Sequence, residues 1–114
     1  SGDDVLLPDF SQHGANGLIS VASNVWPRAI RKFATLCLDQ KSVSVDKIVD
    51  ACNSLFIVSN PIPVKALMHH KGLIQSPYLR LPLDHEDMKD LDLLIDHDRQ
   101  VSEWFEVISS IKAD

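Results

Sequence analysis

Three side chains in the sequence have the right chemistry for covalent or acid–base catalysis. Lys65 follows the block Asn60-Pro61-Ile62-Pro63-Val64, and a lysine amine can attack a carbonyl carbon to form a Schiff base. Asp3 and Asp4 are adjacent, and paired carboxylates can serve as general acid and base. Each also has a structural explanation. Lys65 falls in the first turn of a predicted helix, and aspartates at a helix start cap free amides. We therefore expect structural roles for all three.

Histidines and cysteines are the other residues that could carry chemistry, through a metal ion. His69 and His70 are adjacent, so on a helix their side chains point about 100° apart. A zinc-binding helix instead spaces its two histidines four residues apart. Cys37 and Cys52 are not at ligand spacing and lie on apolar helical stripes. The sequence therefore predicts no metal site and two reduced cysteines in the core of a cytoplasmic protein.

Composition restricts the class of protein. The 114 residues fit one domain, and 45% hydrophobic with 24% charged residues is typical of a folded globular chain. No apolar run approaches the roughly 20 residues of a membrane-spanning helix. The formal net charge of −5 gives no electrostatic footprint for nucleic acid or an anionic membrane. Most of the acidity lies in residues 84–114, which hold ten acidic and three basic side chains, and we expect a solvated helix face there.

Hydrophobic periodicity predicts a mostly helical chain with one strand. The expected helices cover residues 4–13, 27–38, 45–56, 64–71 and 88–111, the last with a possible break at His97-Asp98. Gly14 and Gly72 are expected to end the helices that precede them. Residues 17–22 form a short, nearly continuous apolar run, which is typical of a parallel strand buried on both faces.

This order of elements is unbalanced. One complete strand, with at most a stub at Ser1-Gly2, cannot form a stable parallel sheet because parallel strands need neighbours on both sides. The N-terminal residues therefore look like the last piece of a larger α/β structure, and we expect the chain to be incomplete. An uncovered strand at residues 17–22 would favour association with other chains.

Four short blocks occur in a characteristic order. They are residues 1–4 (Ser-Gly-Asp-Asp), 14–24 (Gly-Ala-Asn-Gly-Leu-Ile-Ser-Val-Ala-Ser-Asn), 60–65 (Asn-Pro-Ile-Pro-Val-Lys) and 79–83 (Leu-Arg-Leu-Pro-Leu). Over residues 1–95 this pattern closely resembles the C-terminal part of the dihydrodipicolinate synthase family. These enzymes are pyruvate-dependent class I aldolases related to N-acetylneuraminate lyase. The second helical segment is about one turn shorter than is usual in the family, and residues 96–114 extend beyond its usual end.

The resemblance implies an α/β fold. The family has a (β/α)8 TIM barrel followed by a helical C-terminal domain, and a full barrel needs about 250 residues. Residues 1–41 would supply the end of strand seven, helix seven, strand eight and helix eight. Residues 42–114 would form the C-terminal helical domain with an acidic extension.

The resemblance also implies a reaction. The family condenses pyruvate with aspartate semialdehyde in lysine and diaminopimelate biosynthesis, through a Schiff base on a strand-six lysine. No position of this chain matches that lysine, so we expect no catalytic residue here, no cofactor, and no activity of the chain alone. Gly2 and Ile19 match family residues beside the bound pyruvate. The partners implied are the missing N-terminal barrel portion and further copies in a cytoplasmic homotetramer.

Two other readings stay open from the sequence. The chain could be a non-catalytic helical module that has lost the barrel chemistry and serves interaction or oligomerisation. It could also belong to a related pyruvate aldolase with a different acceptor, since few acceptor-contacting positions fall in this segment.

Overall fold

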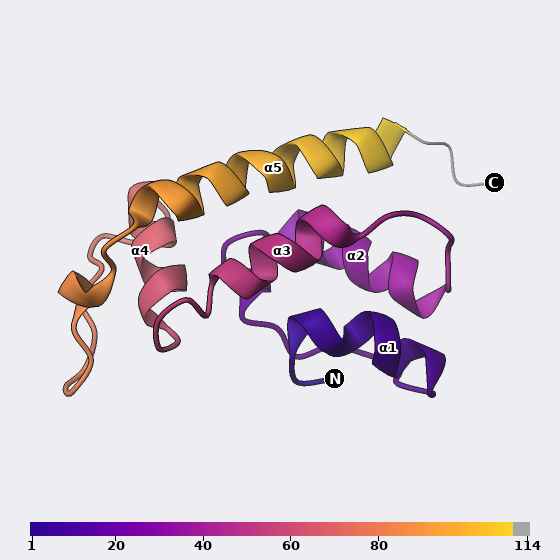
Figure 1. Cartoon of the computed structure of the whole chain (residues 1–114), viewed down its shortest axis with the longest axis horizontal. Coiled ribbons are helices and arrows are strands. Elements are labelled where there is room, and N and C mark those ends of the chain that lie inside the picture. Colours follow the sequence, from indigo (N-terminus) through magenta and orange to yellow (C-terminus); the bar gives the residue numbers. More distant parts are fainter. Residues whose placement is uncertain (111–114) are drawn as a thin grey trace.

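The computed structural model describes residues 1–110 and shows helices joined by short loops. Figure 1 shows α2 and α3 lying between the long helix α5 and the N-terminal helix α1, with α4 at one end. No strand is assigned within residues 1–110. The elements are η1 (Asp4–Leu6), α1 (Leu7–Gln12), η2 (Ala22–Asn24), α2 (Pro27–Leu38), α3 (Asp46–Ser54), α4 (Ile62–His70), η3 (His85–Asp87) and α5 (Leu91–Ser110).

The predicted strand at residues 17–22 is the main difference from the sequence prediction. Residues 17–20 form no regular secondary structure. Ile19 is 83% exposed, so the segment is not buried on both faces, and Ala22 already belongs to η2. The Ser1 amino group donates to the Gly17 carbonyl, and the Ile19 amide donates to the Ser1 carbonyl, both at 2.8 Å. This is the hydrogen-bond pattern of one rung between parallel strands.

Turn residues end the helices where the sequence predicts. Gly14 and Gly72 both adopt positive φ, at 96° and 75°. Glycine is the favoured residue at such a left-handed position after a helix, because glycine has no Cβ. The predicted boundaries after α1 and α4 are therefore confirmed.

Gln40 performs the same task at the end of α2 without being glycine. Its φ is 53°, and the amides of Gln40 and Lys41 donate to the carbonyls of Cys37 and Leu36 at 3.1 and 3.0 Å. Because a side chain strains the left-handed conformation, Gln40→Gly is expected to raise the free energy of unfolding by roughly 0.5–1 kcal/mol. Denaturant unfolding would measure this. Asp39→Gly, at a φ of −82°, is the matched control and should destabilise the chain; stabilisation by both variants would contradict the explanation.

The hydrophobic core lies where these helices meet. Its largest fully buried side chains are Phe33, Leu7, Ile48, Leu55, Leu67 and Leu94. They come from α1 through α5, so the segments 1–41 and 42–110 share one core cluster. The periodic apolar stripes of the sequence therefore meet one another in the folded chain.

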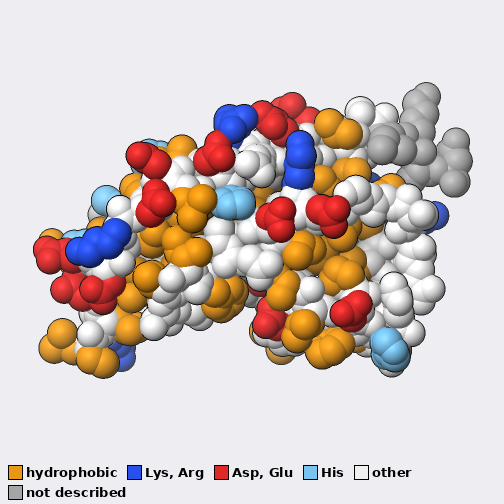
Figure 2. Space-filling model, viewed as in Figure 1, with side chains coloured by type: hydrophobic (Ala, Val, Ile, Leu, Met, Phe, Trp, Pro, Cys, Tyr) orange, Lys and Arg blue, Asp and Glu red, His pale blue; other side chains and the backbone are white. Residues whose placement is uncertain are grey.

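Helix α5 runs without interruption from Leu91 to Ser110, so the suggested break at His97-Asp98 is wrong. Leu94, Val101, Trp104 and Ile108 are buried along one side of it, against α3 and the rest of the core. The opposite side carries exposed charges, as expected for the acidic segment (Figure 2). The helix continues because its apolar spacing keeps the same side facing the core on both sides of residue 97.

Asp98 lies on this helix and joins it to two others. The indole nitrogen of Trp26 donates to Asp98 Oδ1 at 2.8 Å, and Lys71 Nζ donates to the same oxygen at 2.5 Å. Trp26 precedes α2 and Lys71 follows α4. One carboxylate therefore fixes the position of α5 relative to both.

Candidate functional site

Gly2 and Ile19, the two residues that match the family's pyruvate-binding positions, lie on neighbouring segments. Both are linked through Ser1, whose carbonyl accepts the Ile19 amide at 2.8 Å. Gly2 is exposed, and a Cβ placed on it would meet no atom within 4 Å. Ile19 is 83% exposed. Within the described residues, no side chain therefore packs against Gly2, and the Ile19 side chain is not part of the core.

Asp3 and Asp4 have separate roles. The Asp3 carboxylate accepts the Val5 amide at 3.3 Å and caps the first helical turn, as predicted. Asp4 was also expected to cap this helix, and that prediction is wrong. Its buried carboxylate accepts from the Ser20 hydroxyl and from the Ala22 amide, the latter at 3.2 Å. It therefore connects the start of η1 to the turn that follows Ile19.

Lys65 does not join this group. It lies on α4, and its Nζ donates to the backbone carbonyl of Tyr78 at 2.7 Å. Tyr78 is 68% exposed, and its ring meets that of His85 edge to face, with centroids 4.7 Å apart. Lys65 thus fastens the segment after α4, in agreement with the structural role expected from the sequence.

The histidines do not form a metal centre. His69 and His70 are neighbours in the last turn of α4, and both are exposed. Across residues 1–110 there is no group of three or more His, Cys, Asp or Glu side chains that could hold a metal ion. In the same residues, no helix is both long and apolar enough to cross a bilayer.

Both cysteines are buried free thiols, as the sequence predicts. Burial raises the pKa of Cys37. The pKa of Cys52 is raised strongly, first by burial and then by the negative charges of Asp4 and Asp3. A thiol whose pKa is raised stays protonated at neutral pH, so neither side chain supplies a thiolate nucleophile.

The raised pKa of Cys52 predicts a pH dependence of stability. An unfolded chain would lose the thiol proton near pH 9.0, whereas the folded chain keeps it. Unfolding then releases a proton above that pH, so the free energy of unfolding falls as pH rises past 9, by at most about 1.4 kcal/mol per pH unit. Denaturant unfolding between pH 7 and 10.5 should show a steeper decline for the native sequence than for Cys52→Ala. Equal slopes would contradict the assignment.

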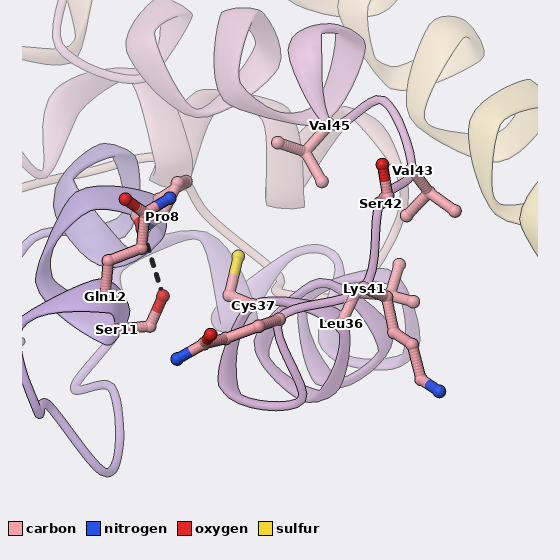
Figure 3. Close-up of a pocket in the computed structure, with 10 residues that line it drawn as sticks. Pro8, Ser11, Gln12, Leu36, Cys37, Lys41, Ser42, Val43 and Val45 are labelled. Carbon is pink, nitrogen blue, oxygen red and sulfur yellow. Dashed lines mark hydrogen bonds between the residues drawn. The ribbon is translucent and has the colours of Figure 1, made fainter.

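A groove of about 560 Å³ lies between α1, the end of α2 and residues 40–45. Figure 3 shows the Cys37 sulfur facing into the groove and the Lys41 amine pointing away from it. The Ser11 hydroxyl donates a hydrogen bond to the Pro8 carbonyl at 3.0 Å. Neither Gly2 nor Ile19 lines this groove. It holds no pairing of a nucleophile with a base, so we place the candidate site at Gly2 and Ile19.

Comparisons with known proteins show which family the chain is similar to. The model of the dihydrodipicolinate synthetase family matches residues 1–96. The 4-hydroxy-tetrahydrodipicolinate synthase of Wolbachia pipientis subsp. Culex pipiens (strain wPip) is 40% identical over 109 residues, covering 96% of this chain and 37% of that protein. The synthase of Francisella tularensis subsp. novicida (strain U112) is 45% identical, covering 92% of this chain and 36% of that protein. The chain thus spans little more than a third of the length of these relatives.

Solved structures give the same result for the fold. The 4-hydroxy-tetrahydrodipicolinate synthase of Methylacidiphilum fumariolicum SolV superposes with a TM-score of 0.81 at 32% sequence identity, covering 99% of this chain and 39% of that one. A monomeric dihydrodipicolinate synthase variant gives a TM-score of 0.75 over 90% of this chain.

These matches bear on two expectations about the fold. The prediction of a C-terminal portion of an α/β TIM-barrel enzyme, itself mostly helical, is confirmed. The family model ends at residue 96, but the Wolbachia match covers all but about five residues and so reaches into the second half of α5. The part of α5 beyond residue 96 thus has a counterpart in that relative, although the family model does not include it. On the family match over residues 1–96 and the identity to these synthases, the chain belongs to the dihydrodipicolinate synthetase family.

Proposed function

We propose that this chain is the C-terminal portion of a cytoplasmic lyase that condenses pyruvate with aspartate semialdehyde through a lysine Schiff base. The reaction would serve lysine and diaminopimelate biosynthesis. The observation that carries the proposal is the parallel rung between Ser1 and residues 17–19, which brings Gly2 and Ile19 side by side at an open edge. Active sites of TIM-barrel enzymes lie at the C-terminal ends of the strands, where these two residues fall in the family's fold.

Gly2 and Ile19 would bind the keto acid without reacting with it. The open space above Gly2 allows a ligand to approach the backbone closely. The exposed Ile19 side chain would form an apolar wall that excludes water from a Schiff base. We assign residues 1–41 to the end of the barrel and residues 42–114 to the helical domain.

The reactive amine would come from outside this chain. The amine of Lys65 is engaged elsewhere, since it donates to the backbone carbonyl of Tyr78. An amine nucleophile is essential, because without it no covalent electron sink forms for the pyruvate carbanion. We therefore propose that the chain works only with the N-terminal barrel portion, without a cofactor, and as a homo-oligomer such as a homotetramer.

Co-expression would test this function. The chain would be produced together with the part of the Francisella tularensis subsp. novicida synthase that lies outside the region matched here, and the purified pair assayed for condensation of pyruvate with aspartate semialdehyde. Activity is expected from the pair and from neither part alone. A folded, associated pair without activity would contradict the proposal and favour a non-catalytic interaction module.

A charge at position 19 provides a site-specific control. Ile19→Asp would place a carboxylate beside the pyruvate carboxylate and should raise the KM for pyruvate at least tenfold, which corresponds to about 1.4 kcal/mol. Val107→Asp introduces the same negative charge at an exposed position of α5 and should leave the KM for pyruvate unchanged. Equal effects of the two variants would show that Ile19 does not border the substrate.

A further inference from the structure

We infer that Asp4 is a positioning residue that sets the separation between Gly2 and Ile19, and through it the affinity for the keto acid. This inference rests on the proposed function, since it concerns the same site. Its basis is a buried hydrogen-bond arrangement that connects two segments sixteen residues apart in the sequence.

The Asp4 carboxylate is fully engaged. It is 1% exposed, one oxygen accepts from the Ser20 hydroxyl, and the other accepts from the Ala22 amide at 3.2 Å. Ser20 Oγ in turn accepts the Ser23 amide at 2.9 Å. No lysine or arginine within residues 1–110 forms an ion pair with Asp4. The charge is therefore held by the hydroxyl and the amide of the turn after Ile19.

The location of these bonds relates them to the candidate site. Asp4 follows Gly2 by two residues, and Ser20 directly follows Ile19. On the other side of the pair, the Ser1 backbone bonds to Gly17 and Ile19. The two segments are thus tied together before and after the residues that would border pyruvate, so neither can shift without breaking one of the two connections.

Burial makes the connection strong. Helix α3 packs on η1, and the charge of Asp4 is felt by the thiol of Cys52 on that helix. Hydrogen bonds to a carboxylate shielded from water are stronger than bonds between neutral groups. The helical domain thus covers the carboxylate that positions the site, although no atom of its described residues, 42–110, lies within 4 Å of a Cβ placed on Gly2.

The test uses the co-expressed pair described above, with Asp4→Asn and Ser20→Ala. In Asp4→Asn the shape is kept, but the amide nitrogen cannot accept a hydrogen bond. The charge-assisted bond from the Ser20 hydroxyl is therefore lost, and only a weaker bond from the amide nitrogen to that hydroxyl can replace it. Active sites are counted by borohydride-trapped pyruvyl adduct, so that unfolded molecules do not enter kcat. We expect the KM for pyruvate to rise about tenfold in Asp4→Asn and severalfold in Ser20→Ala, with kcat per active site within about twofold.

The controls separate positioning from stability. Asp9→Asn removes an exposed carboxylate of α1 and should leave KM unchanged. The double variant should raise KM no more than Asp4→Asn alone, because both changes break the same connection. If Asp4→Asn fails to fold, Ser20→Ala decides. A lower Tm with an unchanged KM for pyruvate would overturn this inference and leave the proposed function standing. No adduct in the unsubstituted pair would overturn both the inference and the proposed function.

Discussion

Trp104→Ala is expected to lower the free energy of unfolding by about 3–5 kcal/mol, the usual cost of removing a buried aromatic side chain. Trp104 is 5% exposed in the second half of α5, and its indole nitrogen donates to the Ser44 carbonyl at 3.0 Å, just before α3. The variant would leave a cavity between the two helices that pack most extensively, and an unpaired carbonyl beside it. Denaturant unfolding followed by circular dichroism would measure the loss.

Two further variants show which interaction is lost. Trp104→Phe keeps most of the packing and removes the hydrogen bond, so a loss of about 1 kcal/mol is expected beyond the change in volume. Val107→Ala, on the same helix but 61% exposed, should change stability by no more than about 0.5 kcal/mol. If Trp104→Ala were as mild as Val107→Ala, the second half of α5 would not be packed on α3.

Asp98→Ala is expected to cost about 2–3 kcal/mol. The substitution removes the acceptor shared by the Trp26 indole and the Lys71 amine. Trp26 is only 4% exposed, so its N–H would be left without a partner away from water, which costs about 1–3 kcal/mol. The charge-assisted bond to Lys71 is lost as well. The same unfolding measurement at neutral pH would give the difference.

The matched control for Asp98 lies two residues earlier. Asp96 pairs with Arg99 on the exposed side of α5, where water and salt screen the attraction between the two charges. Asp96→Ala should therefore be nearly neutral. A similar loss of stability in both variants would mean that removing a negative charge from α5 lowers the free energy of unfolding by itself, whether or not the charge is bonded to Trp26 and Lys71.

Helices and their ends could be predicted from local sequence. The apolar stripes in α2, α3 and α5 lie on one side of each helix, and Gly14 and Gly72 have the positive φ that such positions need. The strand at residues 17–22 could not be predicted correctly, because an apolar run specifies burial only if neighbouring strands are present to cover it. The break suggested at residue 97 rested on polar residues whose partners the local sequence does not reveal.

Contacts between residues far apart in the sequence could not be predicted. Asp98 binds Trp26 across 72 positions of the chain, and Asp4 reaches Ala22 across 18. Neither spacing belongs to a local motif, and an aspartate near a helix start is read first as a cap for its own helix. Gly2 and Ile19 are proposed as site residues from the family pattern alone, since a glycine and an exposed isoleucine carry no chemical signal of their own.

The most direct measurement of the central claim is mass spectrometry of both polypeptides after borohydride reduction with pyruvate. If this chain completes a barrel whose reactive amine lies elsewhere, the reduced pyruvyl group should appear on a lysine of the companion portion, and only when the two parts are combined. A pyruvyl group on Lys65 or any other lysine of the 114-residue chain, or one formed on the companion portion without this chain, would contradict the account.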